Sequence, residues 1–255
     1  IMRVAPAINK EILDAAKNLK VIGVCSVGLN HIDLDTAKEK GIQVFNAPGL
    51  NGNAVAELTF SKMLDLSRHT IPANYDVKVN KTWDKYKFVG RELRGKTLGI
   101  LGFGRIGQHV GRIAGKGLGM KVIAYDPFLP PEIAKEQGVE LVDLDTALAE
   151  GDVISVHMNL TADNKYFFTK ETFAKMKKHP IFINEGRGEM VEEAALKWAL
   201  DEGILRGAGI DMLESEDPET NCQGLFHQIH KKGARSTVWL LTPRLIDYIF
   251  PFSRS

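Results

Sequence analysis

The feature that most constrains this chain is a glycine-rich turn between an apolar run and a helical segment. Residues 97–101 form a short apolar run typical of a buried strand, and they lead into Gly102, Gly104 and Gly107. Residues 106–116 then have the pattern of a helix. In this G-x-G-x-x-G spacing the first Gly permits a tight turn, the second lets a pyrophosphate approach the backbone, and the third lets the helix pack against the strand. The segment predicts a dinucleotide site with the anion at the helix N-terminus.

An acidic residue follows the next predicted strand. Residues 121–125 are a second apolar run, and Asp126 comes directly after it. This position is close to the roughly 20-residue offset at which a carboxylate binds the adenosine ribose 2′-hydroxyl. Strand, helix, second strand and acid in this order favour a dinucleotide site. The alternative is an ordinary glycine-rich turn between a strand and a helix.

Composition argues against several other classes of protein. The 255 residues are 44% hydrophobic and 25% charged with a net charge of +1, as in an ordinary soluble globular protein. Without a basic stripe, this balance argues against nucleic-acid binding. Cys25 and Cys222 are too few for a disulfide framework, and no Cys/His cluster has zinc spacing. We therefore expect no metal and a reducing, cytoplasmic setting. No run of about 18 apolar residues indicates a membrane span.

Short apolar runs alternate with helical patterns, which predicts an α/β fold with a doubly wound parallel sheet. The larger domain, residues 53–245, is the predicted NAD-binding Rossmann domain. Its strands are expected near 97–101, 121–125, 152–157, 181–184, 206–210 and 237–241, and its helices near 106–117, 131–137, 144–150, 170–177 and 191–202. Two further helices are expected over 52–68 and 71–81. Six strands with intervening helices make a complete nucleotide-binding domain.

The segment before residue 52 predicts a second, smaller domain. It offers strands near 19–25 and 42–45 and a helix near 33–40, which is too little for an independent sheet of normal size. We assign residues 1–52 plus 246–255 to this domain, which then looks incomplete at both ends.

Three further segments follow predicted strands at the sheet edge where ligands bind in such folds. They are residues 183–188, 209–218 and 240–245. Taken singly, each has a plain alternative. Arg187 fits a surface cation, the acidic residues of the second segment fit a solvated loop, and Pro243 fits a strand terminator.

Taken together, these segments resemble one family. The motifs that carry the resemblance are residues 46–57, 95–107, 125–127, 184–188 and 211–216. In this order and spacing they are similar to the D-isomer-specific 2-hydroxyacid dehydrogenases, among which the D-3-phosphoglycerate dehydrogenases look closest. The resemblance implies an NAD-dependent enzyme with a Rossmann domain and a flavodoxin-like substrate domain.

The resemblance also implies a cofactor site. Arg105 and Ile106 match the backbone cradle of the pyrophosphate, and Asp126 matches the ribose acid that favours NAD over NADP. Asp211 matches the residue near the nicotinamide carboxamide. The expected cofactor-binding residues are Gly102, Gly104, Arg105, Ile106, Gly107, Asp126, Glu185, Gly186, Arg187 and Asp211.

Substrate and catalytic roles follow from the same resemblance. Arg187 matches the arginine that clamps the substrate carboxylate and polarises its carbonyl, a role that suits a planar guanidinium. Glu216 matches the acid that orients the catalytic histidine. Backbone N–H groups of the next loop are expected to hold the substrate carboxylate. That loop consists of Ser26, Val27 and Gly28.

The expected histidine is replaced in this sequence. Arg244 follows Thr242-Pro243 where the family has the histidine that exchanges a proton with the substrate hydroxyl. An arginine stays protonated and cannot shuttle that proton, although it can stabilise a carbonyl oxygen. We therefore expect Arg187, Glu216 and Arg244 as the catalytic set. His227 and His230 are alternatives as the proton source, while His157 is expected to line or support the cofactor pocket.

These observations leave two hypotheses for function. The first is an oxidoreductase that moves a hydride between nicotinamide and C2 of a small D-2-hydroxy or 2-keto acid. The second is an NAD-binding regulatory or interaction protein that has lost catalysis. Arg244 and the missing glycine-rich turn and return helix after it favour a truncated chain or a degenerate paralogue. The helices over 52–81 resemble the family's dimer-forming region, so a homodimer is expected.

Overall fold

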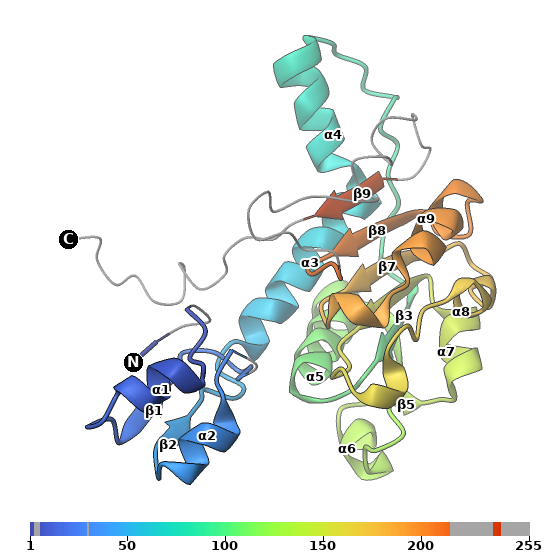
Figure 1. Cartoon of the computed structure of the whole chain (residues 1–255). Helices are drawn as coiled ribbons and strands as arrows, with labels where there is room; N and C mark the ends of the chain where they lie inside the picture. The colour runs from blue at the N-terminus through green and yellow to red at the C-terminus, as the bar shows by residue number, and fades with distance from the viewer. Residues whose placement is uncertain (3–5, 30, 215–236, 241–255) are drawn as a thin grey trace. The chain divides into compact units, whose positions relative to one another are not determined.

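The computed structural model describes residues 1–2, 6–29, 31–214 and 237–240. The chain divides into two compact units, Ile1–Gly52 and Asn53–Ser255, which are coloured by residue number in Figure 1. Residues 246–255, which the sequence assigns to the smaller domain, lie outside the described residues.

The first unit is a small α/β arrangement. Its elements are α1 (Lys10–Ala15), β1 (Val21–Gly23), α2 (Leu34–Glu39) and β2 (Gln43–Phe45). The two strands are parallel, with Val21 opposite Gln43. A core of buried side chains holds these elements together, and it consists of Leu13, Ile22, Val24, Ile32, Ala37 and Ile42.

Sequence patterns missed α1 and overestimated the strand before α2. The helix begins after Asn9, whose side chain accepts a hydrogen bond from the N–H of Ile12 at 3.1 Å, a normal N-cap. Six residues are too few to give a helical period. The predicted strand over 19–25 shortens to β1, and Val24 makes only an isolated parallel bridge to Met2.

The second unit is built on a parallel sheet of seven strands. They are β3 (Thr97–Leu101), β4 (Lys121–Tyr125), β5 (Glu140–Leu141), β6 (Val153–Val156), β7 (Ile181–Asn184), β8 (Gly207–Ile210) and β9 (Thr237–Leu240). Their spatial order is β5-β4-β3-β6-β7-β8-β9, the doubly wound arrangement with its switch point between β3 and β6. The six predicted strands are all present. The count of six was wrong because β5 has only two residues and leaves no pattern.

Helices cover both faces of this sheet (Figure 1). The helices that follow β2 are α3 (Gly52–Arg68), α4 (Thr70–Tyr75), α5 (Arg105–Arg112), α6 (Pro131–Glu136), α7 (Leu144–Glu150), α8 (Lys170–Ala174) and α9 (Glu193–Asp201). Of these, α4 has no buried residue and extends away from the sheet (Figure 1). Shorter turns are η1 (Asp76–Asn80), η2 (Ile113–Gly117), η3 (Ala162–Asn164) and η4 (Gly188–Met190). The predicted helices over 71–81 and 106–117 each end in a π-helical turn, η1 and η2 respectively.

Two apolar cores lie on opposite faces of the sheet. Ile181 and Ile183 of β7 belong to the core that includes α3, α5 and α6. Phe182, between them, belongs to the core that includes α7, α8 and α9. This alternation is the period-two geometry of a strand, and burial on both faces explains why the strands are continuous apolar runs.

Within the described residues, none of the helices combines the length and apolar character that a membrane crossing needs.

Candidate functional site

The turn after β3 has room only for glycine at two positions. Gly102 has φ of +90°, and a Cβ there would lie 2.8 Å from the N of Met158 and 2.9 Å from the carbonyl carbon of His157. A Cβ on Gly107 would lie 2.3 Å from the carbonyl oxygen of Gly102. The first Gly therefore packs against the segment after β6, and the third brings α5 onto the turn. These are the roles that the spacing predicts.

The N-terminus of α5 presents a group of free backbone donors. In the described part of the chain, the N–H groups of Gly104, Arg105, Ile106 and Gly107 donate no hydrogen bond, and Gln108 N is the first to donate, to Gly104 O at 2.9 Å. No heavy atom lies within 4 Å of the position that a Cβ on Gly104 would take. Free donors that face open space at a helix N-terminus suit a phosphate group.

Asp126 is held beside this turn. Its Oδ2 accepts a hydrogen bond from the N–H of Phe103 at 2.9 Å, and its Oδ1 accepts one from the N–H of Phe128 at 3.0 Å. The carboxylate is thus fixed at the end of β4, next to the turn after β3. Each oxygen keeps a lone pair for a ribose hydroxyl.

The loop after β7 is organised by Asn184. This side chain is buried, and its Oδ1 accepts a hydrogen bond from Gly186 N at 3.0 Å while its Nδ2 donates to Arg187 O at 3.1 Å. The N–H of Asp211 donates to Asn184 O at 3.0 Å. Asn184 therefore fixes the backbone of the predicted site residues on both loops. The sequence motif contains Asn184, but no role was predicted for it.

The loops after β7 and β8 pack directly on one another. A Cβ on Gly188 would lie 2.1 Å from the carbonyl carbon of Leu213, so only glycine permits this approach. Arg187 Nη1 lies 3.6 Å from the sulfur of Met212. The structure thus brings Glu185, Gly186, Arg187 and Asp211 to one edge of the sheet, as predicted from the positions of the strand ends.

A buried lysine joins two of these residues and was missed by sequence reasoning. Lys62 of α3 is fully buried, and its Nζ lies 3.0 Å from Glu185 Oε1 and 3.2 Å from Asp211 Oδ1. We call these three residues the Lys62 cluster. Lysine side chains are mostly exposed to water, so the sequence of α3 gave no reason to expect that this lysine is buried. The sequence feature that could have indicated its burial is Glu185, an acid directly after a buried strand that can serve as its partner.

Burial dominates the electrostatics of Glu185. Desolvation raises the pKa of this carboxyl to about 8, the charge of Asp211 also raises it, and the Lys62 ammonium acts against both. Glu185 Oε2 has no hydrogen-bond partner within the described residues. Burial therefore favours the protonated form of this carboxyl.

His157, at the end of β6, is a neutral supporting residue. Burial lowers the pKa of its imidazole to about 3, and its Nε2 lies 2.8 Å from Ser155 Oγ. Because its backbone packs against Gly102, it contributes to the shape of the turn. An imidazole with this pKa does not exchange protons near neutral pH.

The loop of Ser26, Val27 and Gly28 belongs to the first unit. Ser26 Oγ donates to Gly28 O at 3.0 Å, and Asn46 Nδ2 donates to Val27 O at 2.8 Å. In the described chain the backbone N–H groups of the three residues donate no hydrogen bond. The loop thus keeps the free amide donors that a carboxylate-binding role requires.

Four sequence candidates lie outside the described residues: Glu216, Arg244, His227 and His230. The neighbouring Glu214 is described, and its Oε1 accepts a hydrogen bond from Tyr166 Oη at 2.5 Å and lies 3.6 Å from Lys165 Nζ. Among the described residues, no group of three or more His, Cys, Asp or Glu side chains could hold a metal ion.

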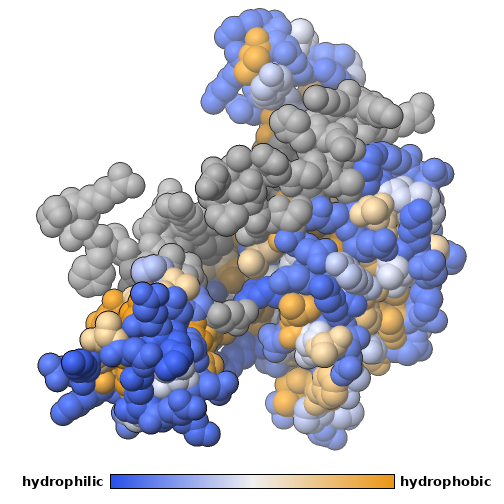
Figure 2. Space-filling model, in the orientation of Figure 1, coloured by the Kyte–Doolittle hydropathy of each residue, from blue (hydrophilic) through white to orange (hydrophobic). Residues whose placement is uncertain are grey.

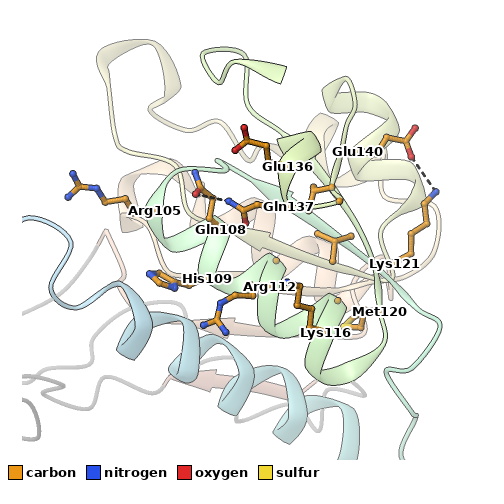
Figure 3. A pocket seen from close by; sticks show the side chains of 15 residues that line it. Arg105, Gln108, His109, Arg112, Lys116, Met120, Lys121, Glu136, Gln137 and Glu140 are labelled. Carbon is orange, nitrogen blue, oxygen red and sulfur yellow. Dashed lines mark hydrogen bonds and ion pairs between the residues drawn. The ribbon is translucent and has the colours of Figure 1, made fainter. Parts of the chain in front are cut away.

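A hollow of about 580 Å³ lies away from this edge, along α5 and the start of β4 (Figure 3). Arg105 is the only predicted site residue that lines it. Gln108 and Gln137 are joined across it by a hydrogen bond of 2.8 Å. Basic side chains of α5 and β4 line it together with the acidic Glu136 and Glu140, and none of the residues after β6, β7 or β8 reaches it. We therefore place the candidate site at the carboxyl ends of the strands and not in this hollow.

Comparison with known proteins agrees with this geometry. Residues 60–231 match the family model "D-isomer specific 2-hydroxyacid dehydrogenase, NAD binding domain". The chain is 42% identical over 222 residues to D-3-phosphoglycerate dehydrogenase of Methanocaldococcus jannaschii, covering 87% of this chain and 42% of that protein. It is 43% identical over 218 residues to hydroxypyruvate reductase of Thermotoga maritima, covering 86% of this chain and 70% of that protein. The chain therefore spans about two fifths of the first relative and more of the second.

Solved structures show the same fold. The apo-structure of D-lactate dehydrogenase from Escherichia coli superposes with a TM-score of 0.80 at 32% identity, over 92% of this chain and 72% of that one. D-lactate dehydrogenase from Aquifex aeolicus, complexed with NAD and lactic acid, superposes with a TM-score of 0.76 at 33% identity, over 92% and 73%. The chain belongs to the D-isomer specific 2-hydroxyacid dehydrogenase family and contains that family's NAD-binding domain.

Proposed function

We propose that this chain transfers a hydride between NAD and C2 of a small D-2-hydroxy or 2-keto acid. The observation that carries this proposal is the position of Arg187. Asn184 fixes its backbone, and it lies on the same sheet edge as the free N–H groups of α5 and Asp126. A guanidinium beside a dinucleotide site suits a substrate with a carboxylate.

Different residues of the chain would bind different parts of the cofactor. The N–H groups of residues 104–107 would hold the pyrophosphate, and Asp126 would accept from the adenosine ribose. Asp211 and the loop of Glu185 and Gly186 would face the nicotinamide half. NAD supplies the hydride acceptor or donor, while the protein binds and orients it.

The substrate roles rest on two groups of donors. Arg187 would make two parallel hydrogen bonds to the carboxylate and polarise the C2 carbonyl. The free N–H groups of Ser26, Val27 and Gly28 would bind a carboxylate, a role that fits the first unit as part of the substrate domain. Glu216 and Arg244 complete the proposed catalytic set. Hydroxypyruvate and 3-phosphohydroxypyruvate are candidate substrates because relatives act on acids of this size.

We further propose that the protein forms a homodimer through the segment around α4. Figure 2 shows apolar atoms exposed on this segment within a hydrophilic surround. Its large apolar side chains are largely exposed, and they include Tyr75, Val77, Val79, Trp83, Tyr86 and Val89. Exposed apolar side chains that gather on one segment are a feature of interaction sites in soluble proteins. A cytoplasmic setting is part of the proposal, because the chain has only two cysteines and Cys25 is a free thiol.

One observation supports a second candidate function, an NAD-binding regulatory protein without turnover. Arg244 stands where the family histidine is expected, and it provides no proton of suitable pKa. In that case cofactor binding persists while hydride transfer does not.

A turnover assay separates the two. The 255-residue chain is mixed with NADH and pyruvate, hydroxypyruvate or 3-phosphohydroxypyruvate, and the loss of reduced-cofactor absorbance is followed. Oxidation of NADH that depends on one of these acids supports the enzyme, at a rate about 10²–10⁴-fold below a typical enzyme. NADH binding without oxidation for any of the acids supports the regulatory protein.

A further inference from the structure

The Lys62 cluster lies where the second half of the cofactor binds. A doubly wound domain consists of two mononucleotide-binding halves on either side of the switch point. The glycine-rich turn and Asp126 belong to β3 and β4, so the adenosine half lies on that side. The nicotinamide half then lies over β6, β7 and β8. Glu185 follows β7 and Asp211 follows β8, which places both carboxyls on the nicotinamide side.

Among the three residues of the cluster, only Asp211 has a partly exposed side chain at this sheet edge. Lys62 and Glu185 have fully buried side chains, whereas the side chain of Asp211 is 27% exposed. A Cβ on Gly209 would lie 3.1 Å from Cβ of Lys62, so β8 packs closely on the stem of this lysine. The three charged groups are therefore fixed against one another and poorly screened by water.

The net charge of the cluster has two values. With Glu185 protonated, Lys62 and Asp211 compensate one another and the net charge is zero. With Glu185 ionised, the net charge is −1. The nicotinamide ring also has two charge states, since the oxidised ring is a cation and the reduced ring is neutral. Only the oxidised ring gains from a nearby negative charge.

We propose that the Lys62 cluster faces the nicotinamide ring and sets the preference of this chain between NAD⁺ and NADH. Ionisation of Glu185 favours NAD⁺ and leaves NADH almost unaffected. This role rests on the binding of NAD and not on turnover.

No other charged group described around Glu185 offsets this effect. Lys62 approaches from α3 and Asp211 from the loop after β8. His157, after the neighbouring strand β6, is neutral because burial lowers its pKa to about 3. Arg187, two residues along the same loop, directs its Nη1 toward the sulfur of Met212.

The test is a titration of the 255-residue chain with NAD⁺ and with NADH by calorimetry between pH 6.5 and 9.5. Burial raises the pKa of Glu185 to about 8, so the ratio Kd(NADH)/Kd(NAD⁺) is expected to rise roughly tenfold across this interval. ADP-ribose, which lacks the ring, should show no matching change. In Glu185→Gln the ratio should stay constant, because the neutral amide resembles the protonated acid at every pH.

Asp65→Asn is the matched control. Asp65 is also a buried carboxyl of α3 whose pKa burial raises. It accepts hydrogen bonds from Thr70 Oγ1 and from Ile71 N at 3.0 Å, and none from the Lys62 cluster. This variant should keep the rise in the ratio. The proposal is overturned if the ratio Kd(NADH)/Kd(NAD⁺) still rises with pH in Glu185→Gln. It is also overturned if the rise is lost in Asp65→Asn and not in Glu185→Gln.

Proton release gives a second measurement that needs no variant. By linkage, if ionised Glu185 favours NAD⁺, then NAD⁺ binding must expel a proton from it near pH 8. Calorimetry in buffers of different ionisation enthalpy should detect this release for NAD⁺ and not for NADH. Binding of both cofactors with no difference in proton release overturns the inference, even if the chain turns over normally. Proton release without turnover supports it while contradicting the proposed enzyme.

Discussion

Asp126 accepts a hydrogen bond from the N–H of Phe103 at 2.9 Å, and this bond joins the end of β4 to the turn after β3. The carboxylate is therefore fixed in place before any ligand arrives. If Asp126 binds the adenosine ribose as proposed, its fixed negative charge will repel the 2′-phosphate of NADPH.

We predict that NADH binds in the micromolar range, which corresponds to about −8 kcal/mol, and that NADPH binds more weakly. Asp126→Asn should narrow the difference, because the amide keeps the shape of the side chain and loses its charge. Fluorescence titration of the unmodified chain and of Asp126→Asn with NADH and with NADPH measures the four dissociation constants. Equal affinities in the unmodified chain, or tighter NADPH binding, would remove Asp126 from the ribose site.

Gly107 and Gly115 provide a matched pair of substitutions. A Cβ on Gly107 would lie 2.3 Å from Gly102 O, whereas the nearest atom to a Cβ on Gly115 would be Val122 Cγ2 at 3.8 Å. Gly107→Ala should cost about 1–3 kcal/mol of folding free energy and weaken NADH binding, since α5 must move from the turn. Gly115→Ala should stabilise by about 0.5–1 kcal/mol. Urea unfolding of both variants tests this, and a harmless Gly107→Ala would contradict the packing.

The glycine-rich turn was predictable from sequence because its constraints are local. Gly102, Gly107 and Asp126 depend on neighbours within one βαβ unit, so their spacing alone identifies them. The location of Arg187 could not be predicted from local spacing alone, since its position at the same sheet edge as the turn depends on the order of the strands. Parallel strands put their carboxyl ends at one edge, which was enough to predict it.

Lys62 and β5 were not predictable, for different reasons. The partners of Lys62 lie 123 and 149 residues away, at Glu185 and Asp211, and nothing in α3 itself shows which way the lysine points. β5 has two residues and pairs only with Ile123 and Ala124 of β4. Tertiary contacts decide both cases, and local patterns do not contain them.

Arg187 should affect the turnover of the substrate far more than the binding of the cofactor. If the chain oxidises NADH with any 2-keto acid, Arg187→Lys should lower kcat/KM by orders of magnitude, because a point charge cannot replace a bidentate fork. The Kd for NADH should change little. Arg112→Lys on the exposed side of α5 is the control and should leave both unchanged. A kcat/KM for Arg187→Lys within about twofold of the unmodified chain would exclude Arg187 from the site.

Glu185 should make the protein less stable as pH rises toward 8. Its folded pKa of about 8 lies above the ordinary value of 4.5, so the folded state holds a proton that the unfolded state has released. Stability therefore falls with pH between these values, by up to about 1.4 kcal/mol per pH unit. His157 has the opposite effect, because its pKa is lowered from 6.5 to about 3 and stability is lost as pH falls below 6.5.

Between pH 6.5 and 8 the stability is therefore expected to depend on Glu185 and not on His157. Urea unfolding across this window should show a falling free energy in the unmodified chain and a flatter profile in Glu185→Gln. Glu150→Gln, an exposed carboxyl near Lys121, should leave the slope as it is. A slope that is the same in Glu185→Gln would mean that this carboxyl is already ionised in the folded state.

Arg244 is the residue on which the choice between enzyme and regulatory protein depends. Its guanidinium stays protonated, so this position offers no group of suitable pKa to exchange the substrate proton. Arg244→His should raise kcat by about 10²–10⁴-fold, and its pH profile should gain a limb near the histidine pKa of roughly 6.5. Steady-state kinetics from pH 5 to 9 measure both. If the unmodified chain already turns over at ordinary rates, another residue supplies the proton, with His227 and His230 as the first variants to test. If Arg244→His changes nothing although NADH still binds, the missing imidazole is not what limits turnover.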